Sequence, residues 1–455
     1  MSPSPDSAGA PTLPLEAASR AVVGRLQQAG HIAYFAGGCV RDRLLGRVPH
    51  DYDVATDAPP EKVQSLFPRT TGLVGKAFGV ICVLERGCQV EVATFRQDLD
   101  YVDGRRPTGV RFVTAEEDAQ RRDFTVNGLF CDPASDPAAD RVIDYVGGQA
   151  DLAKKLIRAI GEPRARFAED KLRLLRAVRF AVTLGFEIEA KTWEAVREAA
   201  GEIAVVSPER IRDELDKIWT GPDPARGLDL LDQSGLLAVV LPELAALHGV
   251  EQPPQFHPEG DVFVHTRLML SGLRNAPLPL ALSVLFHDIG KPPTFAVDET
   301  GRIRFNGHES VGARMTEKVM KRLRYSNEAL EAVVACVANH MAFKDVPNMR
   351  LSTLKRFLAR PTFETEMELH RLDCTSSHGH LDIYRLLQEK LATLPAESID
   401  PDPLVTGHDL MEATGLTEGR RLGQLVRQIR EAQLDGKIAS KEEALALAKH
   451  LLGNS

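Results

Sequence analysis

Two short motifs near the start of the chain have the residue types and spacing that metal-assisted phosphate chemistry needs. Gly37 and Gly38 follow the apolar run 32–36, which predicts a strand ending in a tight turn whose backbone N–H groups can hold phosphate oxygens. Asp51 and Asp53 are separated by one residue, so on an extended segment both carboxylates project from the same face. Neighbouring carboxylates repel each other unless a cation lies between them, and an oxygen-only site suits Mg²⁺. Together the motifs predict a site for phosphoryl or nucleotidyl transfer.

Each motif also has a simpler interpretation. A lone pair of glycines is usually only a turn, and a lone Asp-x-Asp is more often a solvated loop. Their closeness in sequence, with Arg41 and Arg43 between them, favours the chemical interpretation. Residues 80–84 and 89–95 predict a hairpin in which Glu91 lies between two valines. Glu91 is therefore a candidate third carboxylate of the metal site, and the alternative is an edge-strand glutamate that faces solvent.

The pattern Gly-Gly-x-Val-Arg-Asp at 37–42, followed by Asp-x-Asp at 51–53, closely resembles the polymerase-β-like nucleotidyltransferases of the bacterial and eukaryotic CCA-adding enzyme and poly(A) polymerase family. This resemblance covers roughly residues 20–455. It implies an α+β fold, with a nucleotidyltransferase head on a small mixed sheet followed by an all-helical neck, body and tail. The expected parts are a disordered leader (1–14), the head (15–150), a neck with a nucleotide-selecting motif (151–250), an HD-type metal-binding domain (251–380) and a tail that contacts RNA (381–455).

Further nucleotide contacts are expected in the second half of the head. Arg122, Asp123 and Asn127 supply donors for a triphosphate and acceptors for ribose hydroxyls, although such a run is usually only a salt-bridge cluster at the start of a helix. The resemblance assigns sugar recognition to these three residues and phosphate binding to the glycine turn with Arg41. The polar stretch 95–107 predicts a long mobile loop beside the site, and its similarity to the flexible loop of CCA-adding enzymes favours CCA addition.

The run 167–184 predicts one amphipathic helix, whose polar face also carries Arg176 and Arg179 as candidate nucleotide contacts. Asp170 and Arg173 are three residues apart, so on such a helix their side chains lie side by side. Adenine and cytosine both present an amine next to a ring nitrogen that accepts, whereas guanine and uracil present the reverse pattern. An aspartate with an arginine therefore accepts A and C and rejects G and U. An ordinary surface salt bridge is the alternative, and the resemblance to the family's nucleotide-selecting motif favours base reading.

A second constellation lies between residues 250 and 380. An adjacent His-Asp pair, with histidines before and after it, resembles the metal-dependent HD phosphohydrolase domain. Imidazoles with carboxylates suit Mn, Fe, Ni or Zn better than Mg alone. Individually such histidines are more often capping or surface residues, and a domain of this kind can also persist as an RNA-binding scaffold. The six candidate ligands are His265, His287, Asp288, His308, His340 and Asp373.

The composition is that of an ordinary globular protein, with 455 residues, 43% hydrophobic and 26% charged. A net charge of −8 argues against a protein that coats nucleic acid indiscriminately, although a local basic face remains compatible with it. Six scattered cysteines without a CxxC pair indicate neither a disulfide framework nor a zinc knuckle. Residues 1–14 lack the features of a signal peptide, and no apolar run approaches membrane-spanning length. We therefore expect a cytoplasmic protein without a membrane partner; the sequence does not indicate its oligomeric state.

The resemblance implies template-independent addition of C, C and A to the 3′ end of tRNA from CTP and ATP. Asp51 and Asp53 would hold two Mg²⁺ ions, one activating the RNA hydroxyl and one neutralising the triphosphate. Within the same class, the alternatives are a poly(A) polymerase or an enzyme that adds only A or only CC. From another class, the alternative is an HD phosphohydrolase that acts on RNA 3′ ends, with the head only selecting those ends. A noncatalytic RNA-binding protein is disfavoured by the intact carboxylate pair.

Overall fold

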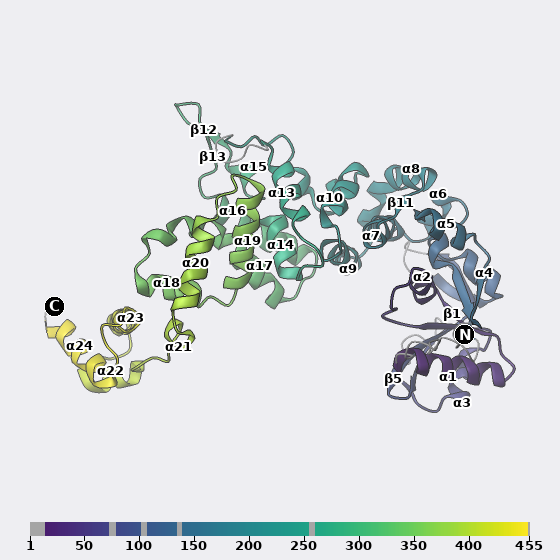
Figure 1. The fold of residues 1–455 in the computed structure, drawn as a ribbon, viewed down its shortest axis with the longest axis horizontal. Helices are drawn as coiled ribbons and strands as arrows, with labels where there is room; N and C mark the ends of the chain where they lie inside the picture. The colour runs from purple at the N-terminus through teal and green to yellow at the C-terminus, as the bar shows by residue number, and fades with distance from the viewer. Residues whose placement is uncertain (1–13, 72–78, 102–106, 134–138, 254–259, 454–455) are drawn as a thin grey trace, which may run out of the picture. The chain divides into compact units, whose positions relative to one another are not determined.

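The computed structural model describes the chain except for residues 1–13, 72–78, 102–106, 134–138, 254–259 and 454–455 (Figure 1). Contacts divide the chain into two compact units, Met1–Val240 and Leu241–Ser455. Among the described residues, the first unit contains the large sheet, and the second is helical apart from the small hairpin β12–β13. The sequence predicts more parts, namely head, neck, body and tail, than these two units, and the bounds of those parts stay predictions.

A seven-stranded sheet in the order β3-β4-β5-β2-β1-β8-β9 forms the centre of the first unit. Its pairing is mixed, because β1 runs antiparallel to β2 and β8 while β2 runs parallel to β5. The sheet and the helical remainder confirm the predicted α+β fold. The strands are β1 (Ala33–Ala36), β2 (Asp53–Thr56), β3 (Thr70–Thr71), β4 (Val80–Glu85), β5 (Cys88–Thr94), β8 (Leu129–Asp132) and β9 (Arg141–Asp144).

Helices cover both faces of this sheet. On one face lie α1 (Pro14–Gln28) and α3 (Pro60–Leu66), where α1 buries Val22 and Leu26 (Figure 1). On the other face α4 (Ala115–Gln120) joins a core that contains Phe95 and Phe130, whose rings meet edge to face. The sheet is therefore a buried and rigid support for the residues at its strand ends.

Several local predictions are confirmed. The predicted hairpin is β4–β5, with Arg86 and Gly87 forming the turn at positive φ. The predicted strand 32–36 is β1, and helix α2 (Gly38–Leu44) begins directly after Gly37. Gly37 has φ 70°, a left-handed conformation that glycine adopts without strain.

Two local predictions are wrong. The stretch 95–107 is predicted as a long mobile loop, whereas the structure forms two strands here, β6 (Arg96–Tyr101) and β7 (Pro107–Phe112), which pair as an antiparallel ribbon; residues 102–106 lie outside the described residues. The single helix expected over 167–184 is two helices, α6 (Pro163–Glu169) and α7 (Arg173–Leu184). Asp170 is extended between them, and its carboxylate accepts the backbone N–H of Leu172 at 3.1 Å. Aspartate side chains compete with helical hydrogen bonds in this way, which ends α6.

The remainder of the first unit is a small helical assembly packed around α7. Its core includes Leu175 and Val178 of α7 and Leu215, Ile218 and Trp219 of α9. The short strands β10 (Leu156–Ile157) and β11 (Glu187–Ile188) pair in parallel beside it. The other elements are η2 (Thr125–Asn127), α5 (Gly148–Lys154), α8 (Ala190–Ala199), η4 (Ala200–Val205), α9 (Pro208–Trp219), α10 (Pro224–Gln233) and α11 (Leu236–Val240).

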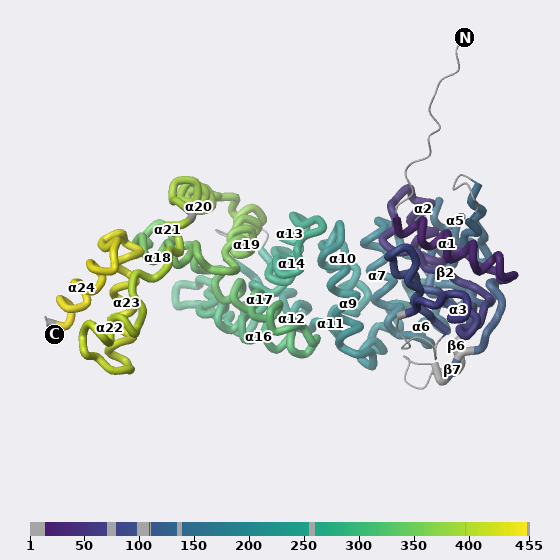
Figure 2. Tube along the Cα trace, turned by 90° about the horizontal axis from the view of Figure 1, so that it is seen from below, coloured from purple at the N-terminus to yellow at the C-terminus, as the bar shows by residue number. Residues whose placement is uncertain are grey.

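In the second unit, α14 (Leu278–Phe286) is buried from Leu280 to its end and is contacted by α13, α17 and α19 (Figure 2). A helix that is apolar all round requires such enclosure, so this group has its own core. The contacting helices are α13 (Val262–Ser271), α17 (Asn327–Asn339) and α19 (Phe363–Ser376), and α16 (His308–Arg322) packs against α17. Short elements beside them are α12 (Pro242–Ala245), α15 (Lys291–Thr294), β12 (Ala296–Val297) and β13 (Ile303–Arg304).

Two further helical groups complete the second unit. Phe343, Phe357 and Leu387 form one core, and Leu410, Leu425 and other residues form another. The first group contains η5 (His340–Asn348), α18 (Leu351–Leu358), α20 (Asp382–Thr393) and α21 (Ala396–Ile399). The second contains α22 (Gly407–Thr414), α23 (Arg420–Leu434) and α24 (Lys441–Gly453).

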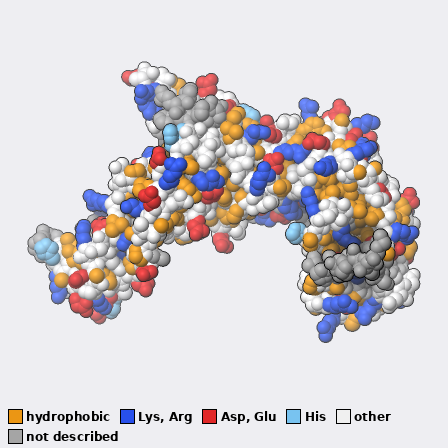
Figure 3. All heavy atoms as spheres, in the orientation of Figure 1, with side chains coloured by type: hydrophobic (Ala, Val, Ile, Leu, Met, Phe, Trp, Pro, Cys, Tyr) orange, Lys and Arg blue, Asp and Glu red, His pale blue; other side chains and the backbone are white. Residues whose placement is uncertain are grey.

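Among the described residues, no helix has the length and apolar character needed to cross a bilayer. On the face drawn in Figure 3, Lys and Arg side chains lie interspersed with Asp and Glu side chains. This mixture agrees with the modest net charge of −8.

Candidate functional site

Three carboxylates meet beside the glycine turn. The register of β1 with β2 pairs Asp53 with Ala36, the residue before Gly37. The parallel pairing of Val54 with Val92 then sets Asp53 beside Glu91, because the two residues precede that pair. Asp51 lies two residues before the start of β2. The structure thus brings the three predicted carboxylates together.

The pKa of Asp53 reflects this crowding. Desolvation and the negative charges of Asp51 and Glu91 raise the pKa of Asp53 to about 6, against the opposing effect of Arg122. The residue nevertheless lies at the surface, so a hydrated ion can reach it. Exposed carboxylates that repel one another in this way form an oxygen donor set that fits Mg²⁺.

The guanidinium group of Arg122 lies against the glycine turn. A Cβ atom at Gly37 would lie 2.9 Å from Nη1 of Arg122, so glycine permits both the left-handed turn and the close approach of the guanidinium. Arg122 also forms an ion pair with Asp118 at 3.1 Å and donates to the carbonyl oxygen of Asn127. These contacts place a positive charge beside Gly37, directly before the start of α2.

Arg41 was expected to bind phosphate, and the structure gives it protein partners. Its Nη1 donates to Oδ1 of Asn127 at 2.6 Å and its Nε donates to Oδ1 of Asp42 at 2.8 Å. Asn127 in turn donates to Oδ1 of Asp123 at 3.1 Å, and Arg176 donates to Oδ2 of Asp123 at 2.7 Å. A continuous polar chain therefore connects α2, next to the glycine turn, with α7.

Asp123 is the buried centre of this chain. Burial alone would raise its pKa, but the charge of Arg176 and the hydrogen bond from Asn127 lower it to about 2. The carboxylate is thus ionised at neutral pH and holds Arg176 in place. Arg176 and Arg179 both pair with Glu214 of α9, and both guanidinium groups lie over the ring of Phe180.

The two residues of the predicted base-reading pair do not bind each other. Both oxygens of Asp170 are held by Arg210 of α9, at 3.2 and 2.7 Å. Arg173 instead binds Glu169 at 2.7 Å and donates to the carbonyl oxygens of Arg166 and Arg121. The assumption of one continuous helix was therefore wrong, and so was the alternative of a salt bridge between them. Sequence reasoning missed Arg210, which lies 40 positions away.

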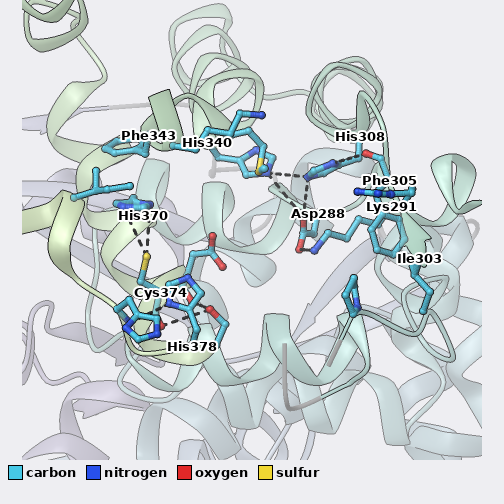
Figure 4. Close-up of a pocket in the computed structure, with 18 of the residues that line it drawn as sticks. Asp288, Lys291, Ile303, Phe305, His308, His340, Phe343, His370, Cys374 and His378 are labelled. Carbon is cyan, nitrogen blue, oxygen red and sulfur yellow. Dashed lines mark hydrogen bonds and ion pairs between the residues drawn. The ribbon is translucent and has the colours of Figure 1, made fainter. Parts of the chain in front are cut away.

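The second constellation is assembled in the helical unit, where the six predicted ligands lie close together; Figure 4 labels Asp288, His308 and His340 among them. Asp288 is at the centre, with Nε2 of His287 at 3.0 Å, of His308 at 3.4 Å and of His340 at 3.9 Å from its oxygens. His265 and Asp373 lie 3.1 Å apart. Two groups within this cluster have ligand atoms close enough to share an ion, namely His265 with His287 and Asp288, and Asp288 with His308 and His340.

Backbone carbonyls orient three of these imidazole rings. The Nδ1 atoms of His287, His308 and His340 lie 2.9, 2.8 and 2.7 Å from the carbonyl oxygens of Val284, Phe305 and Val337. A carbonyl oxygen only accepts hydrogen bonds, so each Nδ1 carries a proton and Nε2 is the ring nitrogen nearer to Asp288, as in histidines that bind metals through Nε2. Burial, followed by the charge of His287, lowers the pKa of His340 to about 3, so this ring is neutral. Imidazole nitrogens together with carboxylate oxygens form a donor set that fits a transition metal.

A cavity of about 710 Å³ opens beside this cluster. Its wall includes Lys291, whose Nζ lies 2.6 Å from Oδ2 of Asp288, and His370, which stacks on Phe343 (Figure 4). Sequence reasoning did not assign a role to His370, whose place in the wall depends on packing between α19 and η5.

Comparison with known families gives three matches along the chain. Residues 33–158 match the poly A polymerase head domain. Residues 185–247 match the probable RNA and SrmB-binding site of polymerase A, and residues 310–448 match tRNA nucleotidyltransferase domain 2.

Individual proteins resemble the chain over nearly its whole length. An A-adding tRNA nucleotidyltransferase of Deinococcus radiodurans is 34% identical over 92% of this chain and 95% of its own. A CCA-adding enzyme of Bacillus velezensis is 34% identical over 92% of this chain and 94% of its own. The crystal structure of the Bacillus stearothermophilus CCA-adding enzyme in complex with CTP has a TM-score of 0.75 at 28% identity, covering 97% of this chain and 98% of that one.

Proposed function

Because this chain belongs to the family of CCA-adding enzymes and related tRNA nucleotidyltransferases, we propose that it completes the 3′ end of tRNA by adding C, C and A from CTP and ATP without a template. The observation that carries this proposal is the trio Asp51, Asp53 and Glu91 beside the turn at Gly37. This arrangement combines a place for divalent ions with a place for the phosphates of the incoming nucleotide.

In the proposed mechanism Asp51, Asp53 and Glu91 would hold two Mg²⁺ ions. Such ions would lower the pKa of the RNA 3′-hydroxyl and neutralise charge on the triphosphate. The N–H of Gly37 donates to the carbonyl oxygen of Leu129, so the backbone N–H groups that follow it, at the start of α2, would donate to phosphate oxygens, and Arg122 adds a positive charge beside them. The chain from Asn127 through Asp123 to Arg176 fixes the groups that face the sugar.

Asp170 and Arg173 remain the proposed base readers, now as two separately held groups. Arg173 uses three of its five N–H groups on protein acceptors within the described part of the chain, so two remain for a ring nitrogen. Asp170 accepts two bonds from Arg210 and one from Leu172, which leaves an oxygen lone pair for an exocyclic amine. Rigidly held groups of this kind can act in place of a template.

Incubation with a tRNA that ends before CCA tests the proposal, using CTP alone, ATP alone and both together. We expect two C residues from CTP alone and a complete CCA from the mixture. The relative in Deinococcus radiodurans makes A-only addition the main alternative within the family. No incorporation of C, together with addition of A to a tRNA ending in CC, would favour that alternative, and a long A tract would favour a poly(A) polymerase.

A second candidate function is phosphohydrolysis of RNA 3′-terminal phosphates at the cluster around Asp288. It is supported by the convergence of the six ligands and by the adjacent cavity. We propose Mn, Fe, Ni or Zn as the ion of this centre. Elemental analysis of protein purified without chelator tests the centre, and hydrolysis of a 3′-phosphorylated oligonucleotide tests the activity. Protein without transition metal would count against both.

The proposed place of action is the cytoplasm. The six cysteines are all free in the structure, as expected for a protein of a reducing compartment.

A further inference from the structure

Tyr52 lies between the two catalytic carboxylates and points to the opposite side of the backbone. Its side chain is 3% exposed, and its ring meets that of Phe35 edge to face, with centroids 5.2 Å apart. The ladder of β2 begins only at Asp53, so Asp51 lies outside it. The position of Asp51 therefore depends on how its neighbour Tyr52 is anchored.

The anchor is a hydrogen bond to helix α1. The hydroxyl of Tyr52 donates to Oε2 of Glu16 at 3.1 Å. The other oxygen of Glu16 accepts from Nε and Nη2 of Arg20, at 3.0 and 2.8 Å. The guanidinium of Arg20 fixes the orientation of the Glu16 carboxylate, so its second oxygen is a well-oriented acceptor for the hydroxyl of Tyr52. Hydrogen bonds to a charged group are stronger than those between neutral groups.

The same network reaches the helix that follows the glycine turn. Asp140 binds Arg20 at 2.5 Å and Arg43 of α2 at 2.7 Å. The two arginines and the two carboxylates, Glu16 and Asp140, balance in charge, and their side chains are only 7–24% exposed. The network thus joins α2, which begins at the phosphate-binding turn, to the segment that carries Asp51 and Asp53.

We propose that Tyr52 and Glu16 are positioning residues that set the spacing between the carboxylate pair and the glycine turn, and thereby the affinity of the head for divalent ions. Neither residue touches the nucleotide. The inference rests on the proposed assignment of Asp51 and Asp53 as metal ligands, and it adds a buried support for them that begins in helix α1.

Tyr52→Phe tests the inference, because it removes one oxygen atom and keeps the ring against Phe35. We expect the Mg²⁺ concentration for half-maximal CMP incorporation to rise about three- to tenfold, the range of one hydrogen bond. At saturating Mg²⁺ the maximal rate and the KM for CTP should return to near wild-type values. Glu16→Ala should act in the same direction, and the double variant should be no worse than the poorer single one, since both remove the same bond.

Binding of Mn²⁺, followed through the electron paramagnetic resonance signal of the free ion, gives a readout that does not depend on activity. Mn²⁺ ions that the wild type binds and Asp53→Ala does not bind are those of the head. In Tyr52→Phe the dissociation constant of these ions should rise about three- to tenfold, the effect of one hydrogen bond. Tyr34→Phe is the matched control. Tyr34 lies in the neighbouring strand and packs on Phe95 and Phe130, away from Glu16.

Wild-type Mn²⁺ affinity in Tyr52→Phe would overturn the inference. So would a lower melting temperature with unchanged metal affinity, because Tyr52 would then be only a core residue. Equal shifts in Tyr34→Phe and Tyr52→Phe would likewise overturn it. If Asp53→Ala loses neither ions nor activity, the metal assignment itself is wrong, and that failure is distinct from failure of the Tyr52 anchor.

Discussion

Replacing Arg210 with alanine should relax the choice of nucleotide, because it frees the carboxylate of Asp170. Two hydrogen bonds from Arg210, at 3.2 and 2.7 Å, hold this carboxylate, and the side chains of Arg210 and Asp170 are 26% and 19% exposed. A bidentate pair partly open to water is worth about 1–2 kcal/mol. If that energy keeps the acceptor aimed at the base amine, its loss lowers selectivity about five- to thirtyfold.

The assay is single-nucleotide incorporation from each of the four NTPs on truncated tRNA, with Asp170→Ala and Arg173→Ala measured beside Arg210→Ala. We expect all three variants to begin to accept UTP or GTP. Arg212→Ala is the matched control, since Arg212 lies in the same helix and pairs with its neighbour Asp213. Wild-type selectivity in both Arg210→Ala and Asp170→Ala would refute the reasoning, and the rejection of G and U would then have to arise elsewhere in the head.

Three further predictions concern the two candidate metal sites. Asp51→Ala should lower incorporation of both CMP and AMP by about a thousandfold or more while circular dichroism shows an intact fold, because every addition uses the same ligands; near-normal rates would contradict the assignment. Since the folded-state pKa of Asp53 is raised to about 6, the folded state loses stability as pH rises from about 4 to about 6. Asp53→Asn should therefore raise the melting temperature at pH 7 without metal and reduce the further rise in melting temperature that Mg²⁺ causes. Equal melting temperatures of Asp53→Asn and the wild type without metal would count against repulsion among the three carboxylates. His287→Ala should remove transition metal in elemental analysis and leave CMP incorporation nearly unchanged, whereas a large loss of incorporation would show that the two sites are coupled.

The parts of the site that depend on short-range sequence were predictable. Gly37 ends a strand at a conformation that favours glycine, and alternation along the chain puts Asp51 and Asp53 on one side. The six candidate ligands, Asp288 among them, were also named from spacing and resemblance, and the structure brings them together. In these cases residue type and local periodicity carry most of the information.

Features that depend on partners far along the chain were not predictable in this way. The apolar pattern of 167–184 continues through Asp170, but the carboxylate of that residue binds Leu172 and Arg210, and the helix breaks there. Polar composition suggested a loop at 95–107, whereas cross-strand pairing of Gln97 with Arg111 helps to form a ribbon. Tertiary partners decided both outcomes against the local propensity.

The most direct test of the central claim is to sequence the 3′ ends of a tRNA that lacks CCA after incubation with the wild-type protein, CTP, ATP and Mg²⁺. The account predicts that nearly all extended molecules end in CCA, and that the Asp53→Ala variant, folded but without its metal ligand, leaves the ends unextended. Ends that carry only A, or that are extended equally by Asp53→Ala, would contradict it.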